Sequence, residues 1–395
     1  YYKRSTSRII EVLKKNWYIF AYCLLRIIAN FYYVFQYSDA RISILSIIIE
    51  EFFLIVFIVI NIATEHEKLK ALLAWVYGSS FVFGIGILES LLGFRTINVI
   101  NTISRDIVQP AYYRLGILRA ESTFVLPNFL GMYCVVLFPI ICYCYMETKR
   151  KTIFLALVLD VFATIFSGCR SDIFILFILI CYYAIFKGTK EKMQYRDVMK
   201  KLIIVVCIVI IVSSCLSSRL WHYYLGTGKA VLNEVGFNFT LDESNDEQGI
   251  EFGDNAERAI YSRTFQLTGV NWVANRNVVF GLGANALTRG VIQYEFDGRW
   301  KVATTCDIGY LGVFEEEGCM GLLAYFVLAL GVMISYIKKW KRNHVEGCQK
   351  CITVSLITYV VCQLVTDRMD SLLWMLMAFY VESNSSLEAC TMDLE

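Results

Sequence analysis

Apolar residues dominate this chain in long runs that short polar segments separate. A run of about 20 apolar residues lets one helix cross the hydrocarbon core of a membrane. The pattern therefore predicts about ten membrane-spanning helices, with the last two the shortest. The expected spans are residues 17–36, 42–62, 72–92, 125–146, 152–168, 171–187, 202–221, 309–337, 351–366 and 370–384.

The polar segments between these runs predict three parts. Residues 1–221 are expected to hold seven membrane helices and a first outer loop at about 93–124. Residues 222–308 are expected to form a large extracytoplasmic loop, and residues 309–395 the C-terminal membrane helices. The predicted fold class is an all-α, polytopic membrane protein with about ten transmembrane helices and one large extracytoplasmic loop.

Composition supports a membrane protein and gives no sign of a metal site. The 395 residues are 57% hydrophobic and 18% charged, which is too apolar for one soluble domain. Most of the fourteen cysteines lie in apolar runs, where they are expected to act as small hydrophobic residues. The three histidines lie far apart, and the acidic stretch at 242–257 lacks calcium-loop spacing. We therefore expect no metal and no cofactor.

Lysines and arginines separate onto opposite sides of the predicted membrane. One side carries sixteen lysines and five arginines, and the other carries two lysines and thirteen arginines, with Arg26 inside a span. Lysine-rich short loops mark the cytoplasm. The arginine guanidinium grips phosphate at two points, which lysine cannot do. The pattern predicts an enzyme that handles a phosphate-bearing substrate on the outer face; the net charge of +2 gives no indication of nucleic acid.

A few charged residues fall inside the predicted spans, where an unpaired charge is costly. These residues are Arg26, Glu50, Glu51, Glu89, Asp160 and the run Glu315–Glu317. Glu50, Glu51 and Asp160 are expected either to form structural pairs, for example with Arg26, or to mark a functional pathway. A position near the membrane interface explains Glu89 and Glu315.

Two short stretches place arginine near the predicted outer surface. Arg119 and Glu121 are spaced to point the same way on an extended segment, or to pair locally. Arg170 lies at the tip of a tight helical hairpin, at the depth where a lipid-linked pyrophosphate would sit. Both arginines are therefore candidates for phosphate binding, although a surface ion pair or a snorkelling side chain explains them equally simply.

Two further stretches lie within the second half of the predicted outer loop. The Gly281-x-Gly283 pair lacks the third glycine of a dinucleotide fingerprint, so a tight turn between two amphipathic helices is expected. Asp307 begins the eighth span, where an aspartate can cap the helix or serve as the base that deprotonates a sugar hydroxyl.

Together these stretches resemble the O-antigen polymerase/ligase superfamily of bacterial polysaccharide assembly, from about residue 70 to the end. The matching residues are Arg119-Ala-Glu-Ser-Thr-Phe with Pro127-Asn128, Ser167-Gly-Cys-Arg170, Ser262-Arg263, Phe280-Gly-Leu-Gly283-Ala-Asn-Ala-Leu287, and Asp307-Ile-Gly-Tyr310-Leu with Glu317-Gly318 and Gly321.

The resemblance implies an all-helical enzyme that transfers a glycan from undecaprenyl diphosphate to an acceptor hydroxyl, with inversion and without a metal. It implies that Arg119, Arg170 and Arg263, and also Arg219, bind the diphosphate. Ligases of the superfamily carry a His-Asn where this chain has Asp307-Ile308, which favours a polymerase. The expected base is Asp307 or, as the second choice, Glu121.

The resemblance also implies a location and partners. We expect a multi-pass protein of the bacterial cytoplasmic membrane whose active site faces outward. Its partners would be an undecaprenyl diphosphate-linked oligosaccharide, membrane lipid, a flippase and a chain-length regulator. The alternatives are a ligase-type transferase to another acceptor and a lipid-linked glycan flippase or transporter. A transporter would need matching halves with broken helices, and glycine and proline do not interrupt matching spans here.

Overall fold

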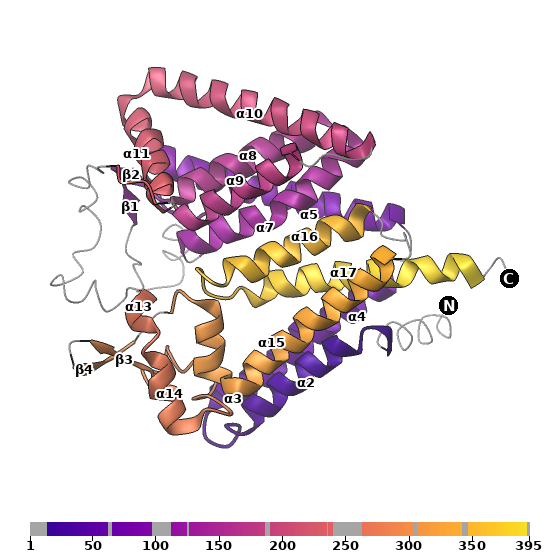
Figure 1. Ribbon diagram of the computed structural model, residues 1–395, viewed down its shortest axis with the longest axis vertical. Helices are drawn as coiled ribbons and strands as arrows, with labels where there is room; N and C mark the ends of the chain where they lie inside the picture. The colour runs from indigo at the N-terminus through magenta and orange to yellow at the C-terminus, as the bar shows by residue number, and fades with distance from the viewer. Residues whose placement is uncertain are drawn as a thin grey trace. The chain divides into compact units, whose positions relative to one another are not determined.

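The computed structural model describes residues 14–61, 65–96, 112–185 except 125, 190–239 except 235, 263–303 except 297, 306–341 and 347–392. Helices make up most of this part of the chain (Figure 1). The chain forms two compact units. The first comprises Tyr1–Lys68, Phe252–Leu356 and Gln363–Glu395, and the second comprises Leu69–Glu251 and Ile357–Cys362.

The first unit joins helices from both ends of the chain. The elements are α2 (Trp17–Phe31), α3 (Ser38–Ser46), the π-helix η1 (Ile47–Phe52), α4 (Phe53–Asn61), α13 (Arg263–Gln266), α14 (Gly269–Asn277), β3 (Gln293–Phe296), β4 (Arg299–Val302), α15 (Gly309–Lys341) and α17 (Asp370–Met392). The helix α16 (Gly347–Cys362) is divided between the two units.

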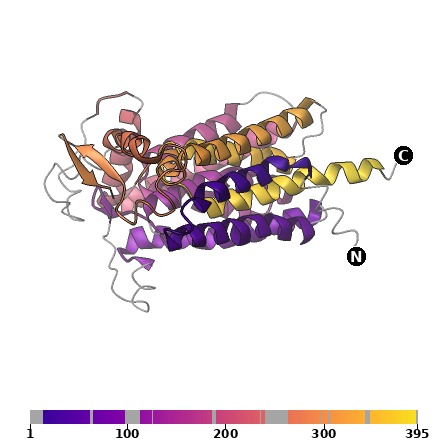
Figure 2. The ribbon, with the colours of Figure 1, turned by 90° about the horizontal axis from the view of Figure 1, so that it is seen from below.

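Helices α2 and α15 lie side by side and run in opposite directions (Figures 1 and 2). Near one end Tyr18 packs against Gly331, where an added Cβ would lie 2.1 Å from the tyrosine Cγ. A residue without a side chain allows two helix backbones to approach closely. Farther along, Arg26 of α2 meets Glu317 of α15. These two contacts fix the register of the pair.

A small core joins α14 to the β3–β4 hairpin, which projects from the same unit (Figure 2). The strands pair Tyr294 with Lys301 in an antiparallel register. Tyr294 is fully buried against Val273, Ala286 and Ile292. Hydrophobic burial therefore anchors the end of the predicted outer loop before α15 begins.

The second unit is built mainly from helices that are consecutive in the chain. The elements are α5 (Glu65–Leu92), β1 (Tyr113–Arg114), β2 (Ile117–Leu118), α7 (Pro127–Thr148), α8 (Lys151–Ser167), α9 (Arg170–Ile185), α10 (Lys190–Leu216) and α11 (Ser218–Glu234). Helices α7, α8 and α9 pack on one another (Figure 1). Pro127 begins α7, the position where its missing N–H is tolerated.

The helical fold class is confirmed in its coarse form. Four helices are long and apolar enough to cross a membrane, namely His66–Leu92, Pro127–Thr148, Tyr195–Leu216 and Gly309–Lys338. Shorter apolar helices cover Trp17–Phe31, Gly347–Cys362 and Asp370–Val381. These helices are compatible with a membrane protein, whereas ten spans and the large loop stay predictions. The acidic stretch at 242–257 lies outside the described residues.

Three details differ from the sequence-based expectation. Two short β-hairpins interrupt the all-α pattern. The predicted span 202–221 is divided, because α10 ends at Leu216 and α11 begins at Ser218. The Gly281-x-Gly283 turn does not join two helices, because the β3–β4 hairpin follows it.

The charge asymmetry predicts the sidedness of two loops. We expect a cysteine introduced at Ser244 to react with a membrane-impermeant maleimide in intact cells, and one introduced at Thr189 to react only after lysis. The unmodified protein, with its native cysteines, sets the baseline. Labelling of position 189 but not of position 244 in intact cells would show the opposite topology and contradict the prediction.

Candidate functional site

The C-terminal end of α8 collects donors from distant parts of the second unit. The last carbonyls of a helix have no partner within the helix and carry its negative dipole end. Four consecutive carbonyls are satisfied here from outside the helix. Ile165 accepts from the Tyr223 hydroxyl at 2.7 Å, Phe166 from the Ala120 amide at 2.9 Å, Ser167 from Arg119 Nε at 2.7 Å, and Gly168 from Arg114.

Arg119 links two of the sequence stretches that carry the resemblance. Its Nε binds the Ser167 carbonyl, and its Nη2 donates to Asn128 Oδ1 at 2.9 Å. The Cys169 thiol donates to the same amide oxygen at 3.3 Å. The stretch around residues 119–128 therefore lies directly against the turn at residues 167–170. Arg119 does not pair locally with Glu121, which corrects that alternative.

Two more predicted arginines belong to the same unit. Arg170 is the first residue of α9 and is half-buried. Arg219 is exposed on α11 and donates to the Gly116 carbonyl in the turn of the β1–β2 hairpin. Arg114 of that hairpin reaches the α8–α9 turn. Arg263 begins α13 in the first unit, and its side chain lies outside the described part of the structure.

Glu121 is a buried structural carboxylate in the second unit. Its Oε2 accepts from Arg95 Nε at 3.1 Å and from Arg95 Nη2. Glu89 lies beneath it and accepts the backbone N–H groups of Thr96, Glu121 and Ser122. Burial raises the pKa of Glu121 to about 7 in spite of Arg95. With only 1% of its surface exposed, Glu121 is poorly placed to meet a sugar hydroxyl.

Asp307 lies in the first unit and is held by one side chain. Its backbone N–H donates to Gln266 Oε1 at 2.9 Å, and its Oδ2 accepts from Gln266 Nε2 at 3.3 Å. The helix α15 begins two residues later, at Gly309. The helix-cap interpretation of Asp307 is therefore wrong, and the carboxylate is instead oriented by the Gln266 amide.

Helix α15 is broken at Gly318, which has φ 64° and ψ −155°. The loop after α14 fills the break. Leu282 and Gly283 donate N–H groups to the Glu315 and Glu316 carbonyls at 2.8 and 2.9 Å. Beyond the break, Cys319 and Met320 donate to the Val278 and Val279 carbonyls at 2.9 and 3.1 Å.

Glycine is required on both sides of this contact. A Cβ on Gly281 would lie 2.5 Å from the Glu316 carbonyl carbon, and one on Gly318 would lie 2.4 Å from the Gly281 nitrogen. Both residues also have positive φ, which side chains disfavour. Glycine therefore interrupts one predicted span, the eighth, at Gly318.

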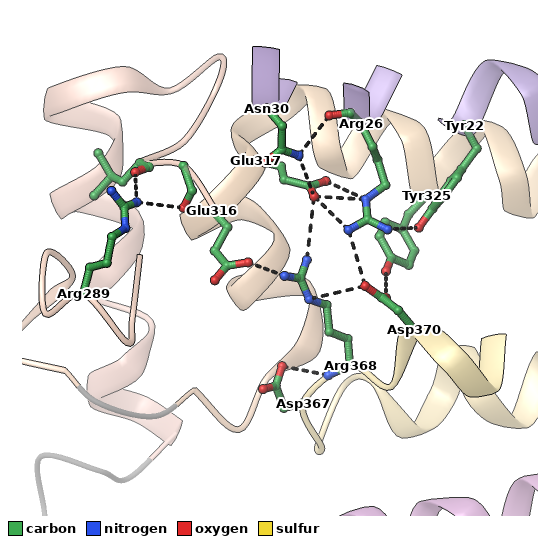
Figure 3. Close-up of polar contacts among 12 residues, drawn as sticks. Tyr22, Arg26, Asn30, Arg289, Glu316, Glu317, Tyr325, Asp367, Arg368 and Asp370 are labelled. Atoms are coloured by element: carbon green, nitrogen blue, oxygen red, sulfur yellow. Dashed lines mark hydrogen bonds and ion pairs between the residues drawn. The ribbon is translucent and has the colours of Figure 1, made fainter. Parts of the chain in front are cut away.

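A buried ion network lies beside the break (Figure 3). Arg26 Nε lies 3.0 Å from both oxygens of Glu317, and its Nη2 lies 2.8 Å from Oε1. Nη2 also reaches Asp370 Oδ2 at 3.4 Å, and Nη1 donates to the Tyr22 hydroxyl at 3.0 Å. Asn30 adds an amide donor to Glu317 at 3.3 Å. Arg26 therefore pairs with Glu317 and Asp370. Of its expected partners, Asp160 belongs to the second unit, and the side chains of Glu50 and Glu51 lie outside the described part of the structure.

Arg368 extends this network from the start of α17. It forms an ion pair with Glu316, and its Nε lies 3.9 Å from Asp370 Oδ2 (Figure 3). Tyr325 donates to the other Asp370 oxygen at 3.0 Å. The two arginines therefore face three carboxylates in this network, including Glu317.

A cavity of about 320 Å³ borders the network within the first unit. Such a volume is typical of small-ligand sites. The walls come from α2, α3, η1, α4, α15, α17 and the turn at residues 284–285. The lining residues are Arg26, Asp39, Ile42, Ser43, Ser46, Ile47, Leu54, Ala284, Asn285, Glu316, Arg368, Asp370, Ser371, Trp374 and Met375.

Sequence reasoning missed this cavity, although it noted Arg26 and the Glu315–Glu317 run. The sequence does contain a signal for it. Arg26 and the acidic run have opposite charges and lie at similar depths in two apolar segments, so they could have been paired. Comparison with protein-family models, curated proteins and solved structures finds no match.

The raised pKa of Glu121 predicts a pH-dependent stability. Folded Glu121 keeps its proton up to about pH 7, whereas the unfolded chain loses it near the ordinary value of 4.5, so stability falls as pH rises between these values. We expect the Glu121→Gln variant to avoid this loss. Its melting temperature relative to wild type should therefore be higher at about pH 8 than at about pH 5.

Thermal unfolding of the purified full chain in lipid nanodiscs provides the measurement. Glu147→Gln, which changes an exposed glutamate of α7, is the matched control and should show no such trend. An equal effect of Glu121→Gln at both pH values would contradict the prediction.

Proposed function

We propose that the protein is a bacterial cell-surface polysaccharide polymerase. It would transfer a glycan from undecaprenyl diphosphate to a hydroxyl of an acceptor sugar, with inversion and without a metal. One observation carries the proposal furthest. The stretches that contain Arg119 and Arg170, both part of the resemblance, lie against each other through the Arg119–Ser167 and Cys169–Asn128 hydrogen bonds.

The arginine arrangement suits a diphosphate leaving group. Negative charge grows on the diphosphate as its bond to the sugar breaks, and fixed guanidinium groups stabilise that charge. Asn128 and the Ser167 carbonyl fix the orientation of the Arg119 guanidinium. Arg170 begins the next helix at the same turn. In this proposal Arg219 adds a further contact to the diphosphate from the same unit, and the assignment of Arg263 rests on the resemblance alone.

The acceptor hydroxyl needs orientation and a base. Asp307 is the better candidate because it is only partly buried and one amide side chain orients it. Glu121 is buried and engaged by Arg95, so we assign it a supporting role in holding the Arg119 segment. The proposed site faces the outside of the cytoplasmic membrane, and the proposed partners are a flippase and a chain-length regulator.

Deletion of the gene in the source organism separates the proposed activity from its alternatives. For a polymerase we expect long surface polysaccharide to disappear while single lipid-linked repeat units accumulate on the outer face of the membrane. Glycan gel electrophoresis and mass spectrometry of extracted lipids provide the measurement. Long polymer that stays on its lipid would indicate a ligase, and units confined to the inner face would indicate a flippase.

Complementation with arginine variants tests the diphosphate contact. Because lysine keeps the charge but loses the two-point grip, Arg170→Lys should lower polymer yield by about tenfold or more. Arg119→Lys should do the same, with a further loss of stability because two hydrogen bonds change. Arg150→Lys, at the opposite end of α8, is the matched control. Normal polymer length and yield in both variants, with normal protein levels, would remove the two arginines from the site.

A further inference from the structure

The cavity beside the Arg26 network takes no part in the diphosphate contact described above. We propose that this cavity binds an uncharged saccharide, which in the proposed reaction is the terminal sugar of the acceptor. Only the acceptor role rests on the proposed function. The binding of a sugar rests on the walls of the cavity alone.

The charge of the lining disfavours an anionic ligand. Arg26 and Arg368 face the carboxylates of Asp39, Glu316 and Asp370, and Glu317 lies directly behind Arg26. Arg26 already forms ion pairs with Glu317 and Asp370, and Arg368 with Glu316. A phosphate or carboxylate would bring a further negative charge into a place where acids outnumber bases. A neutral ligand avoids this repulsion.

The polar groups of the lining match a ligand that both donates and accepts hydrogen bonds. The Trp374 side chain is 1% exposed, and its Nε1–H has no acceptor among the described residues. Arg368 Nη1 likewise donates no hydrogen bond there, and its nearest carboxylate oxygen is 4.0 Å away. Neither nitrogen has accessible surface in this structure, so a ligand oxygen would reach it only after the side chain moves; an unsatisfied buried donor is costly, which favours such a movement.

Acceptors line the same space. The Glu316, Asp370 and Asp39 carboxylates and the hydroxyls of Ser43 and Ser371 border the cavity. Each hydroxyl of a sugar can donate to a carboxylate and accept from an indole or guanidinium N–H. The cavity volume of about 320 Å³ is at the lower end of the range for small-ligand sites, which suits a small sugar.

The wall itself has the form of a ligand site. The π-helix η1 supplies Ile47, and such segments often occur at functional sites. The broken helix α15 supplies Glu316, whose backbone is fixed by Gly283. The polar groups are therefore held in position before any ligand arrives, which lowers the cost of binding.

Saturation-transfer NMR on the full chain in lipid nanodiscs tests the proposal. The probes are the methyl glycosides of glucose, galactose and N-acetylglucosamine, and detergents with sugar headgroups are avoided. We expect transfer to at least one glycoside. Ser43→Leu and Ser371→Leu, which fill the cavity from α3 and from α17, should weaken that binding by about tenfold or more, which is about 1.4 kcal/mol.

Ser218→Leu makes the same change at the start of α11, at a residue that does not line the cavity, and should bind like wild type. Melting temperatures show whether each variant is folded. If one of the two cavity-filling variants does not fold, the other still tests the proposal. No transfer to any glycoside, or binding that neither folded filler weakens, would overturn the proposal. Displacement of the glycoside by inorganic diphosphate would also overturn it, because the cavity would then accept an anion.

The two proposals fail separately. If the protein binds no sugar, the gene-deletion phenotype expected for a polymerase does not change. A deletion strain that still makes normal polymer would remove the acceptor role but not the binding of sugar to the cavity.

Discussion

The first unit depends on the pairing of Arg26 with Glu317. Their side chains are 3% and 2% exposed, so both charges are largely removed from bulk water. The two residues are 291 positions apart, and their contact joins α2 to α15. Removal of one partner from a buried pair typically costs about 3–5 kcal/mol, because the other charge stays buried. Arg368 and Asp370 are then bound to the same centre, which ties the start of α17 to it.

The break in α15 lies next to the same centre. Glu316 and Glu317 come just before Gly318, and the break frees the carbonyls of Glu315 and Glu316. In an apolar surrounding these groups need donors, and the N–H groups of Leu282 and Gly283 supply them. These hydrogen bonds hold the loop after α14 beside the ion network, and Ala284 and Asn285 of that loop line the cavity. One helix break thus connects the ion network, the loop and the cavity.

Much of the helical fold could be predicted from apolar runs, because run length alone marks a segment that can form a long buried helix. The starts of α7 and α8 lie within two residues of the predicted ones. The break at Gly318 could not be predicted, since one glycine in an apolar run is usually tolerated. The partner of Arg26 was also missed, because spacing along one segment does not say which distant segment packs beside it. For the candidate site, only the resemblance indicated that the Arg119 and Arg170 stretches lie close together. Neither the residue pattern nor the resemblance indicated the contact between Gln266 and Asp307.

The arginines of the second unit show why a structural and a binding role need not compete. Arg119 donates two hydrogen bonds, to the Ser167 carbonyl and to the Asn128 side-chain amide. Its positive charge thereby offsets the negative end of the α8 dipole. The same bonds hold the guanidinium in one orientation, which a flexible surface arginine would lose entropy to reach. A half-buried, pre-oriented arginine is therefore better suited to grip a phosphate than a free one. The contacts at the end of α8 stabilise the fold. In the proposed enzyme they also hold the Arg119 guanidinium in place to stabilise the departing diphosphate.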